Sequence, residues 1–236
     1  MKTSLSLRAW LGSTTLCLLA LAAGQASAAS LSVSGYTLGE SVSVISGAHT
    51  GTVNTAQLDI GIPGDTGFGY CVDLAQSIGV GTTSGWDLRN PALSDSVIRA
   101  AWLVDTFQPQ LDSLVHPAGD AFSFAVTRQT AIAALQVSIW EVMSETPGNY
   151  DLYSGAFSLA KGGASSGVMN LSRQFLGALS GADLSGFQTG AIWAVSPTQQ
   201  DQLFFGHTNP IPEPGTALLY AFGAAIVAFS LRRQIV

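Results

Sequence analysis

The sequence predicts an α+β domain that is rich in strands, with strands before and after a helical middle region. Three observations predict this class. Apolar and polar residues alternate between residues 31 and 74, which is the period of a half-buried strand. Between residues 91 and 181, apolar residues recur at steps of three and four, which is the period of a helix. Strand-like runs then return between residues 190 and 205.

The first strands are a weak one over residues 31–45 and a clear pair over residues 58–74. A Pro-Gly-Asp turn at residues 63–65 separates the two runs of the pair, which indicates a hairpin. Cys71 and Asp73 fall on the face opposite the apolar residues of the second run, because successive side chains of a strand point to opposite sides. The apolar positions of the pair are Leu58, Ile60 and Ile62, then Phe68, Tyr70, Val72 and Leu74.

The middle region predicts three helices. The first lies within residues 90–107, where serine and aspartate precede the apolar positions as they do at helix starts. The second and longest runs from about residue 125 to residue 144 and stops before a Pro-Gly pair. Gln136 lies on the shoulder of its apolar stripe, which consists of Ile132, Leu135, Ile139 and Val142. The third helix ends at Gly181.

The last strands are "TGAIWAV" and "DQLFF", which close a domain that we expect to cover residues 29–206. A short linker follows over residues 207–214. Fourteen of the fifteen acidic residues, but only five of the nine basic ones, lie between residues 29 and 210. Since no basic stripe or run is present, nucleic acid is not an expected partner.

Residues 1–28 have the order of a secretory signal peptide. Two basic residues precede an apolar run, and an Ala-Ser-Ala cleavage pattern ends at Ala28. Removal of this segment would leave Cys71 as the single cysteine, because the sequence has only two and the other is Cys17. A single cysteine forms no intramolecular disulfide, so it indicates either intermolecular pairing or a reactive thiol.

Residues 215–236 hold an uncharged apolar run followed by Arg232 and Arg233. The run is close to the minimum of about 17 residues for a membrane span, and the arginine pair would stay cytoplasmic by the positive-inside rule. The linker before it ends in the motif Pro212-Glu213-Pro214. The order of motif, apolar helix and basic stop resembles the PEP-CTERM sorting signal, which exosortase processes in Gram-negative bacteria with extracellular polysaccharide systems.

This resemblance implies an exported protein of the cell envelope, the cell surface or the extracellular matrix. An exosortase-type processing enzyme would be one partner. The inner membrane would be another, bound transiently through the C-terminal helix.

Two motifs in the predicted domain carry a second resemblance. Tyr70-Cys71-Val72-Asp73 is similar to the aromatic-Cys motif on a strand in the thioester domain of bacterial surface adhesins. Gln136, Ile139 and Trp140 match the Thr-Gln-x-Ala-Ile-Trp motif of that family, with Leu135 in place of its threonine and Ser138 in place of its alanine. The resemblance covers roughly residues 30–205 and implies a thioester-domain-like fold, with strands around a helical insertion.

The resemblance also implies an internal thioester between Cys71 and Gln136, with Tyr70, Asp73, Ile139 and Trp140 in support. The thiolate attacks the glutamine carboxamide, ammonia leaves, and an amine or hydroxyl of a surface target later takes the acyl group. Such a bond needs the two side chains held in near-attack geometry. It is used once, so the chain is expected to be a covalent adhesin rather than an enzyme, with no cofactor.

Other interpretations stay open at this point. A lone cysteine on a strand is usually a small buried hydrophobe, so a non-covalent structural or polysaccharide-associated matrix protein is the alternative. Gln129 is a rival partner for Cys71, although no Ile-Trp follows it. Asp73 and Glu141 are placed to move protons, but each is more simply a solvated carboxylate. The three histidines, His49, His116 and His207, show neither a thiol-hydrolase signature nor metal-ligand spacing.

Overall fold

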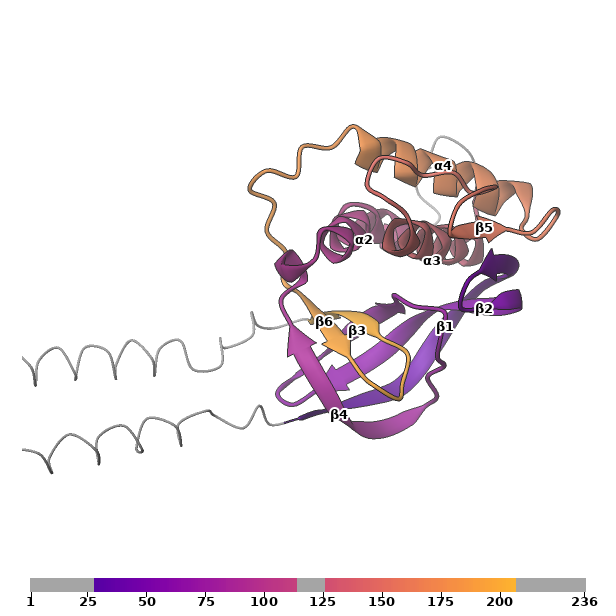
Figure 1. The fold of residues 1–236 in the computed structure, drawn as a ribbon. Helices are drawn as coiled ribbons and strands as arrows, with labels where there is room; N and C mark the ends of the chain where they lie inside the picture. Colours follow the sequence, from indigo (N-terminus) through magenta and orange to yellow (C-terminus); the bar gives the residue numbers. More distant parts are fainter. Residues whose placement is uncertain (1–27, 114–125, 207–236) are drawn as a thin grey trace, which may run out of the picture.

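A computed structural model describes residues 28–113 and 126–206 of the chain (Figure 1). The signal peptide, the linker and the sorting segment expected from the sequence lie outside these ranges. The described chain is a mixed α and β structure with a large antiparallel sheet, which is compatible with the predicted α+β class. Figure 1 shows α2, α3 and α4 gathered on one side of the sheet.

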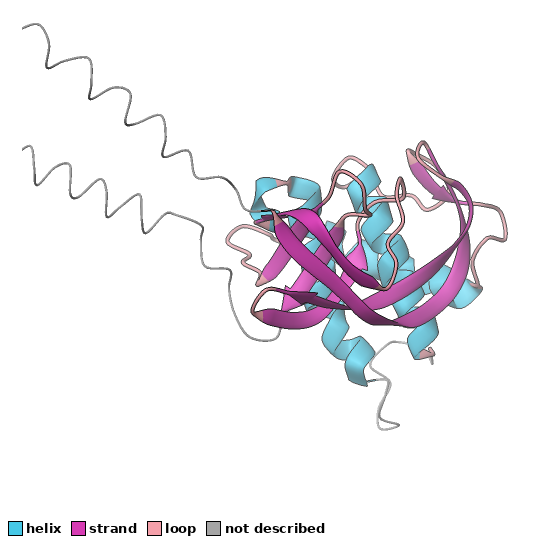
Figure 2. Cartoon of the chain, turned by 90° about the horizontal axis from the view of Figure 1, so that it is seen from below, coloured by secondary structure: helices cyan, strands magenta, loops and turns pink. Residues whose placement is uncertain are grey.

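The strands form a closed, antiparallel barrel. The sheet order is β2-β3-β7-β6-β4-β1-β5, and a further pairing of β1 with β2 joins the two sides of the ring. Seen from the barrel side, the strands curve around with the helices behind them (Figure 2). The strands are β1 (Ala29–Ser46), β2 (Thr50–Ile62), β3 (Asp65–Cys71), β4 (Gly81–Arg89), β5 (Phe157–Leu159), β6 (Ala191–Val195) and β7 (Gln202–Gly206).

The barrel separates two hydrophobic cores. Its interior holds Trp86 among aliphatic side chains from several strands. The larger core lies between the barrel and the helices and takes Tyr70 and Val72 from β3 and the segment after it. Cys71, between them in sequence, packs instead against the interior core, as the predicted alternation requires.

The helical layer consists of a short 3-10 helix, η2 (Pro91–Leu93), and three α-helices, α2 (Asp95–Ser113), α3 (Arg128–Ser144) and α4 (Ser166–Ser180). Thr127 caps α3 by accepting a hydrogen bond from the Thr130 backbone N–H. Ser165 caps α4 in the same way, accepting from Val168. Among the described helices, none is long and apolar enough to cross a membrane.

The structure confirms the predicted hairpin, the three helices and the two late strands, and it differs in three places. The strands β4 and β5 were not predicted, because β4 is polar or glycine apart from Trp86 and Leu88 and β5 has only three residues. The first helix continues past Pro109 to Ser113, and Leu111 in this extension is fully buried. The helix α3 is buried on all sides rather than along one stripe, because it lies between the barrel and the other helices.

Candidate functional site

Cys71 is the last residue of β3, and β7 runs beside it. The register pairs Cys71 directly with Gln202, the first residue of β7. The next pair along, Val72 with Asp201, is joined by a hydrogen bond from the Val72 N–H to the Asp201 carbonyl at 3.0 Å. Since hydrogen-bonded and non-hydrogen-bonded pairs alternate in an antiparallel ladder, Cys71 and Gln202 form a non-hydrogen-bonded pair, in which the side chains are closest.

A glycine in β3 allows this close strand pairing. At Gly67 an added Cβ would overlap the backbone carbonyl of Phe205 in β7. Any other residue there would push the two strands apart. The glycine-rich run before Cys71 thus serves the approach of β7.

The carboxamide of Gln202 reaches the sulfur of Cys71. Its Nε2 donates to the Sγ of Cys71 at 3.5 Å and to the carbonyl of Gln200 at 2.9 Å. Gln202 is fully buried, and its Oε1 accepts no hydrogen bond from the part of the chain that the structure describes. An unsatisfied buried acceptor is rare in folded proteins and calls for a specific reason.

Gln136 of α3 contacts the backbone of the same cysteine. Its Nε2 donates to the Cys71 carbonyl at 2.7 Å, and its Oε1 accepts from the Cys71 N–H at 3.3 Å. The side chain is fully buried, which differs from the surface or capping position usual for a glutamine on a helix shoulder. The structure thus brings Cys71 and Gln136 together, but through the main chain of the cysteine.

Asp73 ties the segment after β3 to the segment before β7. Its Oδ1 accepts from the N–H groups of Ala75 and Gln76, and its Oδ2 accepts from the N–H of Asp201 at 2.6 Å. Its own carbonyl accepts from Nε2 of Gln200 at 2.6 Å. These bonds give Asp73 a structural role, because they hold the ends of the two strands together beside the Cys71–Gln202 pair.

The thiol of Cys71 is protonated at neutral pH. Burial raises its pKa to about 12, although the hydrogen bond from Gln202 acts in the opposite direction. The nearby charge of Asp73 also raises this pKa. The site therefore does not hold Cys71 as the thiolate that a thiol hydrolase uses.

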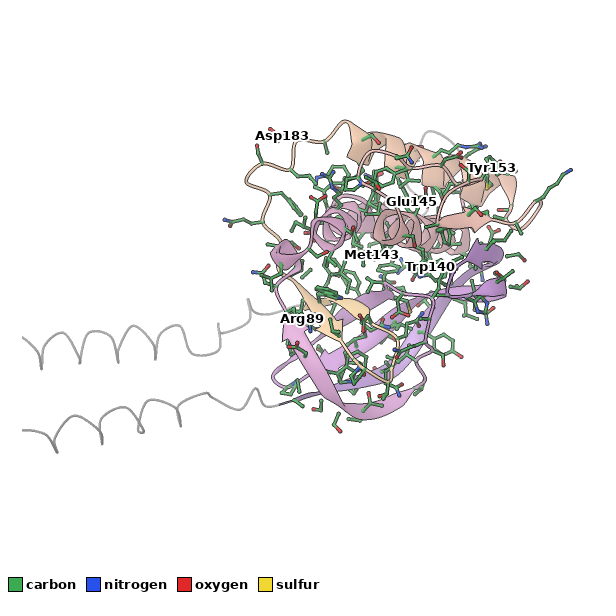
Figure 3. The ribbon with its side chains drawn as sticks, in the orientation of Figure 1. Arg89, Trp140, Met143, Glu145, Tyr153 and Asp183 are labelled. Atoms are coloured by element: carbon green, nitrogen blue, oxygen red, sulfur yellow. The ribbon has the colours of Figure 1, made fainter. Side chains whose placement is uncertain are left out.

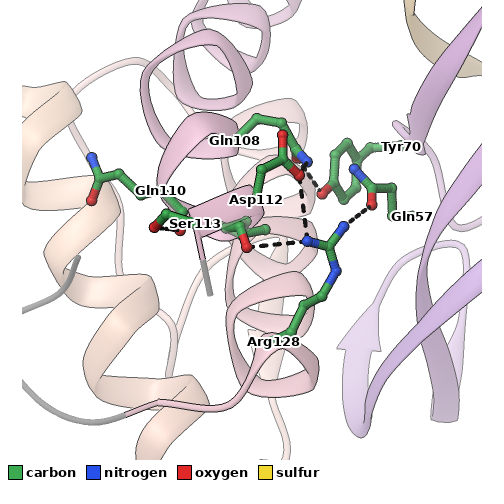
Figure 4. A network of polar contacts seen from close by, with 8 residues as sticks. Gln57, Tyr70, Gln108, Gln110, Asp112, Ser113 and Arg128 are labelled. Atoms are coloured by element: carbon green, nitrogen blue, oxygen red, sulfur yellow. Dashed lines mark hydrogen bonds and ion pairs between the residues drawn. The ribbon is translucent and has the colours of Figure 1, made fainter. Parts of the chain in front are cut away.

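Tyr70 is held by a polar network on the helical side of the barrel (Figure 4). Its hydroxyl donates to Oε1 of Gln108 at 2.8 Å, and Nε2 of Gln108 donates to Asp112 at 2.9 Å. Arg128 donates from Nη1 to Oδ1 of Asp112 and from Nη2 to Oε1 of Gln57 in β2. The network joins α2, α3 and β2 around the ring that precedes Cys71.

Removal of the Tyr70 hydroxyl should destabilise the domain. In a Tyr70→Phe variant, Oε1 of Gln108 would stay buried without its donor, which costs about 1–2 kcal/mol in the free energy of unfolding. Urea unfolding followed by circular dichroism measures this change. Tyr153→Phe is the control, since Tyr153 is exposed and its loss should change stability little. Equal stability of the Tyr70 variant and the parent would contradict this role for the network.

Ile139 and Trp140 are buried in the core between the helices and the barrel. The Trp140 ring packs at a tilt on Phe157, with ring centroids 6.3 Å apart. Trp140 and Met143 also line a cavity of about 370 Å³ beside the segment that follows Cys71. Figure 3 shows these two side chains where α3 faces the barrel. Ile139 and Trp140, the two residues expected to support the site, thus contribute to the packing of the core beside it.

The interpretation of Glu141 as a solvated carboxylate is wrong. Glu141 is fully buried in α3, where its Oε1 accepts from the Asp151 N–H at 2.6 Å. Its Oε2 has no hydrogen-bond partner among the described residues. Burial raises its pKa to about 7.

The remaining candidates do not join the site. Gln129 is exposed at the start of α3. His49 lies in the turn between β1 and β2, whereas His116 and His207 fall outside the described residues. Within residues 28–113 and 126–206, no group of three or more histidine, cysteine, aspartate or glutamate side chains could hold a metal ion.

Gln202 is a site residue that the sequence pattern does not single out. The run "DQLFF" that contains it predicts only a closing strand. A signal was present, because Gln202 alternates with Phe204, a fully buried residue of the barrel interior, and is therefore a polar residue on an apolar face. Its connection to Cys71 depends on the pairing of β3 with β7, which the local sequence does not specify.

Comparisons with known proteins return no match for this chain, whether with family models, curated proteins or solved structures.

Proposed function

We propose that this protein is an exported, single-use covalent adhesin whose reactive group is an internal thioester of Cys71. The observation that carries the proposal is the contact between the Cys71 sulfur and the Gln202 carboxamide, in which Sγ and Nε2 are 3.5 Å apart. The glutamine nitrogen at this contact is the leaving group of thioester formation. The acyl donor that the geometry favours is thus Gln202.

Thioester formation needs only these two side chains as reactants. The Cys71 sulfur attacks the Gln202 carbonyl carbon, the bond from that carbon to Nε2 breaks, and the thiol proton leaves with the nitrogen as ammonia. Opposed residues of neighbouring strands hold their Cβ atoms about 4.5–5.5 Å apart. A link of one sulfur and two carbons spans this separation, and near-attack placement lowers the barrier of an otherwise slow reaction.

Gln136, the partner expected from the sequence, is the second candidate. Its carboxamide is committed at both ends to the main chain of Cys71, and a bond to the sulfur would require it to leave those two hydrogen bonds. Gln202 already donates to the sulfur and loses one other bond, to Gln200. The position of the acyl group after labelling separates the two assignments.

Burial supports a bond that persists until a target arrives. Gln202, which supplies the acyl carbon, is fully buried and Cys71 is half-buried, so bulk water has limited access to the acyl carbon. An amine or hydroxyl of a target surface would replace the sulfur, which leaves a free thiol and an acylated target. Export by the signal peptide and processing by exosortase at Pro212-Glu213-Pro214 belong to the same proposal and rest on the sequence alone.

The intact mass of the mature domain tests the proposal. We expect the purified, unreduced domain to be lighter by one ammonia than its sequence mass and to show no titratable thiol. Methylamine should restore one thiol per chain and attach to Gln202, as mapped by peptide mass spectrometry. A fully titratable Cys71 thiol before treatment would refute the covalent mechanism and leave the matrix-protein alternative.

A further inference from the structure

We propose that Gln136 is a positioning residue that holds the main chain of Cys71 in register for thioester formation with Gln202. This inference rests on the proposed function. It gives Gln136 a role other than that of acyl donor, and it gives the helical layer a part in the chemistry of the barrel.

The backbone of Cys71 needs a partner on the side away from β7. Because Val72 bonds to Asp201 of β7, the N–H and C=O of Cys71 point to the opposite side, toward β2. The pairing of β2 with β3 ends, however, at Leu58 and Gly69. The main chain of Cys71 therefore lies just beyond the strand that would have satisfied it.

The Gln136 side chain takes the place of the missing strand. A carboxamide carries one acceptor and one donor side by side, as a backbone peptide group does. Gln136 uses both, accepting from the Cys71 N–H and donating to the Cys71 carbonyl. The match between these two groups explains why a glutamine is fully buried at this position of α3.

The two hydrogen bonds from Gln136 hold the Cys71 main chain in a fixed position, which attack of the sulfur on Gln202 requires. With the Cys71 backbone held by Gln136 and the next residue held by β7, rotation about χ1 is the main freedom left to the sulfur. The helix that carries Gln136 is itself held in place, since α3 is buried from Thr130 to Val142. Misplacement of reacting groups by about 1 Å can cost about 10²-fold in rate.

The test compares the rate of bond formation with the stability of the fold. The Gln136→Met variant keeps the length of the side chain and removes both hydrogen bonds. Protein recovered unfolded from inclusion bodies would be refolded by dilution, and the loss of ammonia would be followed by intact mass over time. Thermal stability would be measured in parallel in the Cys71→Ala background, where no thioester forms.

We expect the Met variant to fold and to form the thioester at Gln202 at least tenfold more slowly than the parent. Gln129→Met is the matched control on the same helix and should leave the rate unchanged, because Gln129 is exposed. Bond formation at the parent rate in the folded Met variant would overturn the positioning role and leave the thioester standing. Amine label on Gln136 of the parent would also overturn it, and a parent without ammonia loss would overturn the proposed function together with it.

Discussion

Replacement of Gln202 by alanine should abolish the thioester and leave the Cys71 thiol fully titratable. The change removes the carboxamide whose Nε2 contacts the Cys71 sulfur, so neither ammonia loss nor methylamine labelling can occur. The expected effect is complete loss of both signals. Intact mass and thiol titration of the purified domain measure it directly.

Gln200→Ala is the matched control for this variant. Gln200 is a buried glutamine two residues before Gln202, and its Nε2 also bonds to the segment after β3, at the carbonyl of Asp73. Its side chain bonds to the Asp73 carbonyl and not to the sulfur, so its variant should keep the thioester even if the fold is somewhat weakened. Ammonia loss in the Gln202→Ala protein would show that another glutamine is the acyl donor, with Gln136 the first to examine.

The sequence could predict Cys71 and its strand but not the full site. Strand alternation correctly placed Tyr70 and Val72 on one side of β3 and Cys71 on the other. That parity is local information, because it follows from the period of a strand. The approach of Gln202 depends on a pairing between segments 131 residues apart, and no local pattern encodes that pairing.

The burial of residues in α3 is a second feature that the local sequence pattern does not predict. Periodicity places α3 and its apolar residues correctly, but it puts Gln136 only on the shoulder of the apolar stripe and leaves Glu141 to be interpreted as a solvated carboxylate. Both are fully buried, because Gln136 packs against Cys71 of the barrel and Glu141 lies against the segment that holds Asp151. Sequence pattern alone does not reveal how many neighbours a helix has, so it cannot separate a solvated carboxylate from a buried one.

Glu141 should make the domain less stable as the pH rises from about 4.5 to about 7. Its pKa is raised from 4.5 to about 7, first by burial and then by the charges of Glu145 and Asp151, against the hydrogen bond from the Asp151 N–H. The folded state therefore keeps a proton that the unfolded state has already lost in this interval. Each pKa unit corresponds to 1.36 kcal/mol, so this group alone should lower the free energy of unfolding by about 3 kcal/mol across the interval.

A Glu141→Gln variant isolates this effect, because glutamine keeps the acceptor for the Asp151 N–H but does not titrate. The amide nitrogen of the glutamine in this variant is also buried, and it changes the free energy of unfolding by an amount that does not depend on pH. We therefore expect the difference in free energy of unfolding, variant minus parent, to rise by about 3 kcal/mol between pH 4 and pH 8. Urea unfolding at a series of pH values measures it, with Glu40→Gln as a control at a different site. A difference that stays flat with pH would mean that Glu141 has the same pKa in the folded and the unfolded protein, despite its burial in α3.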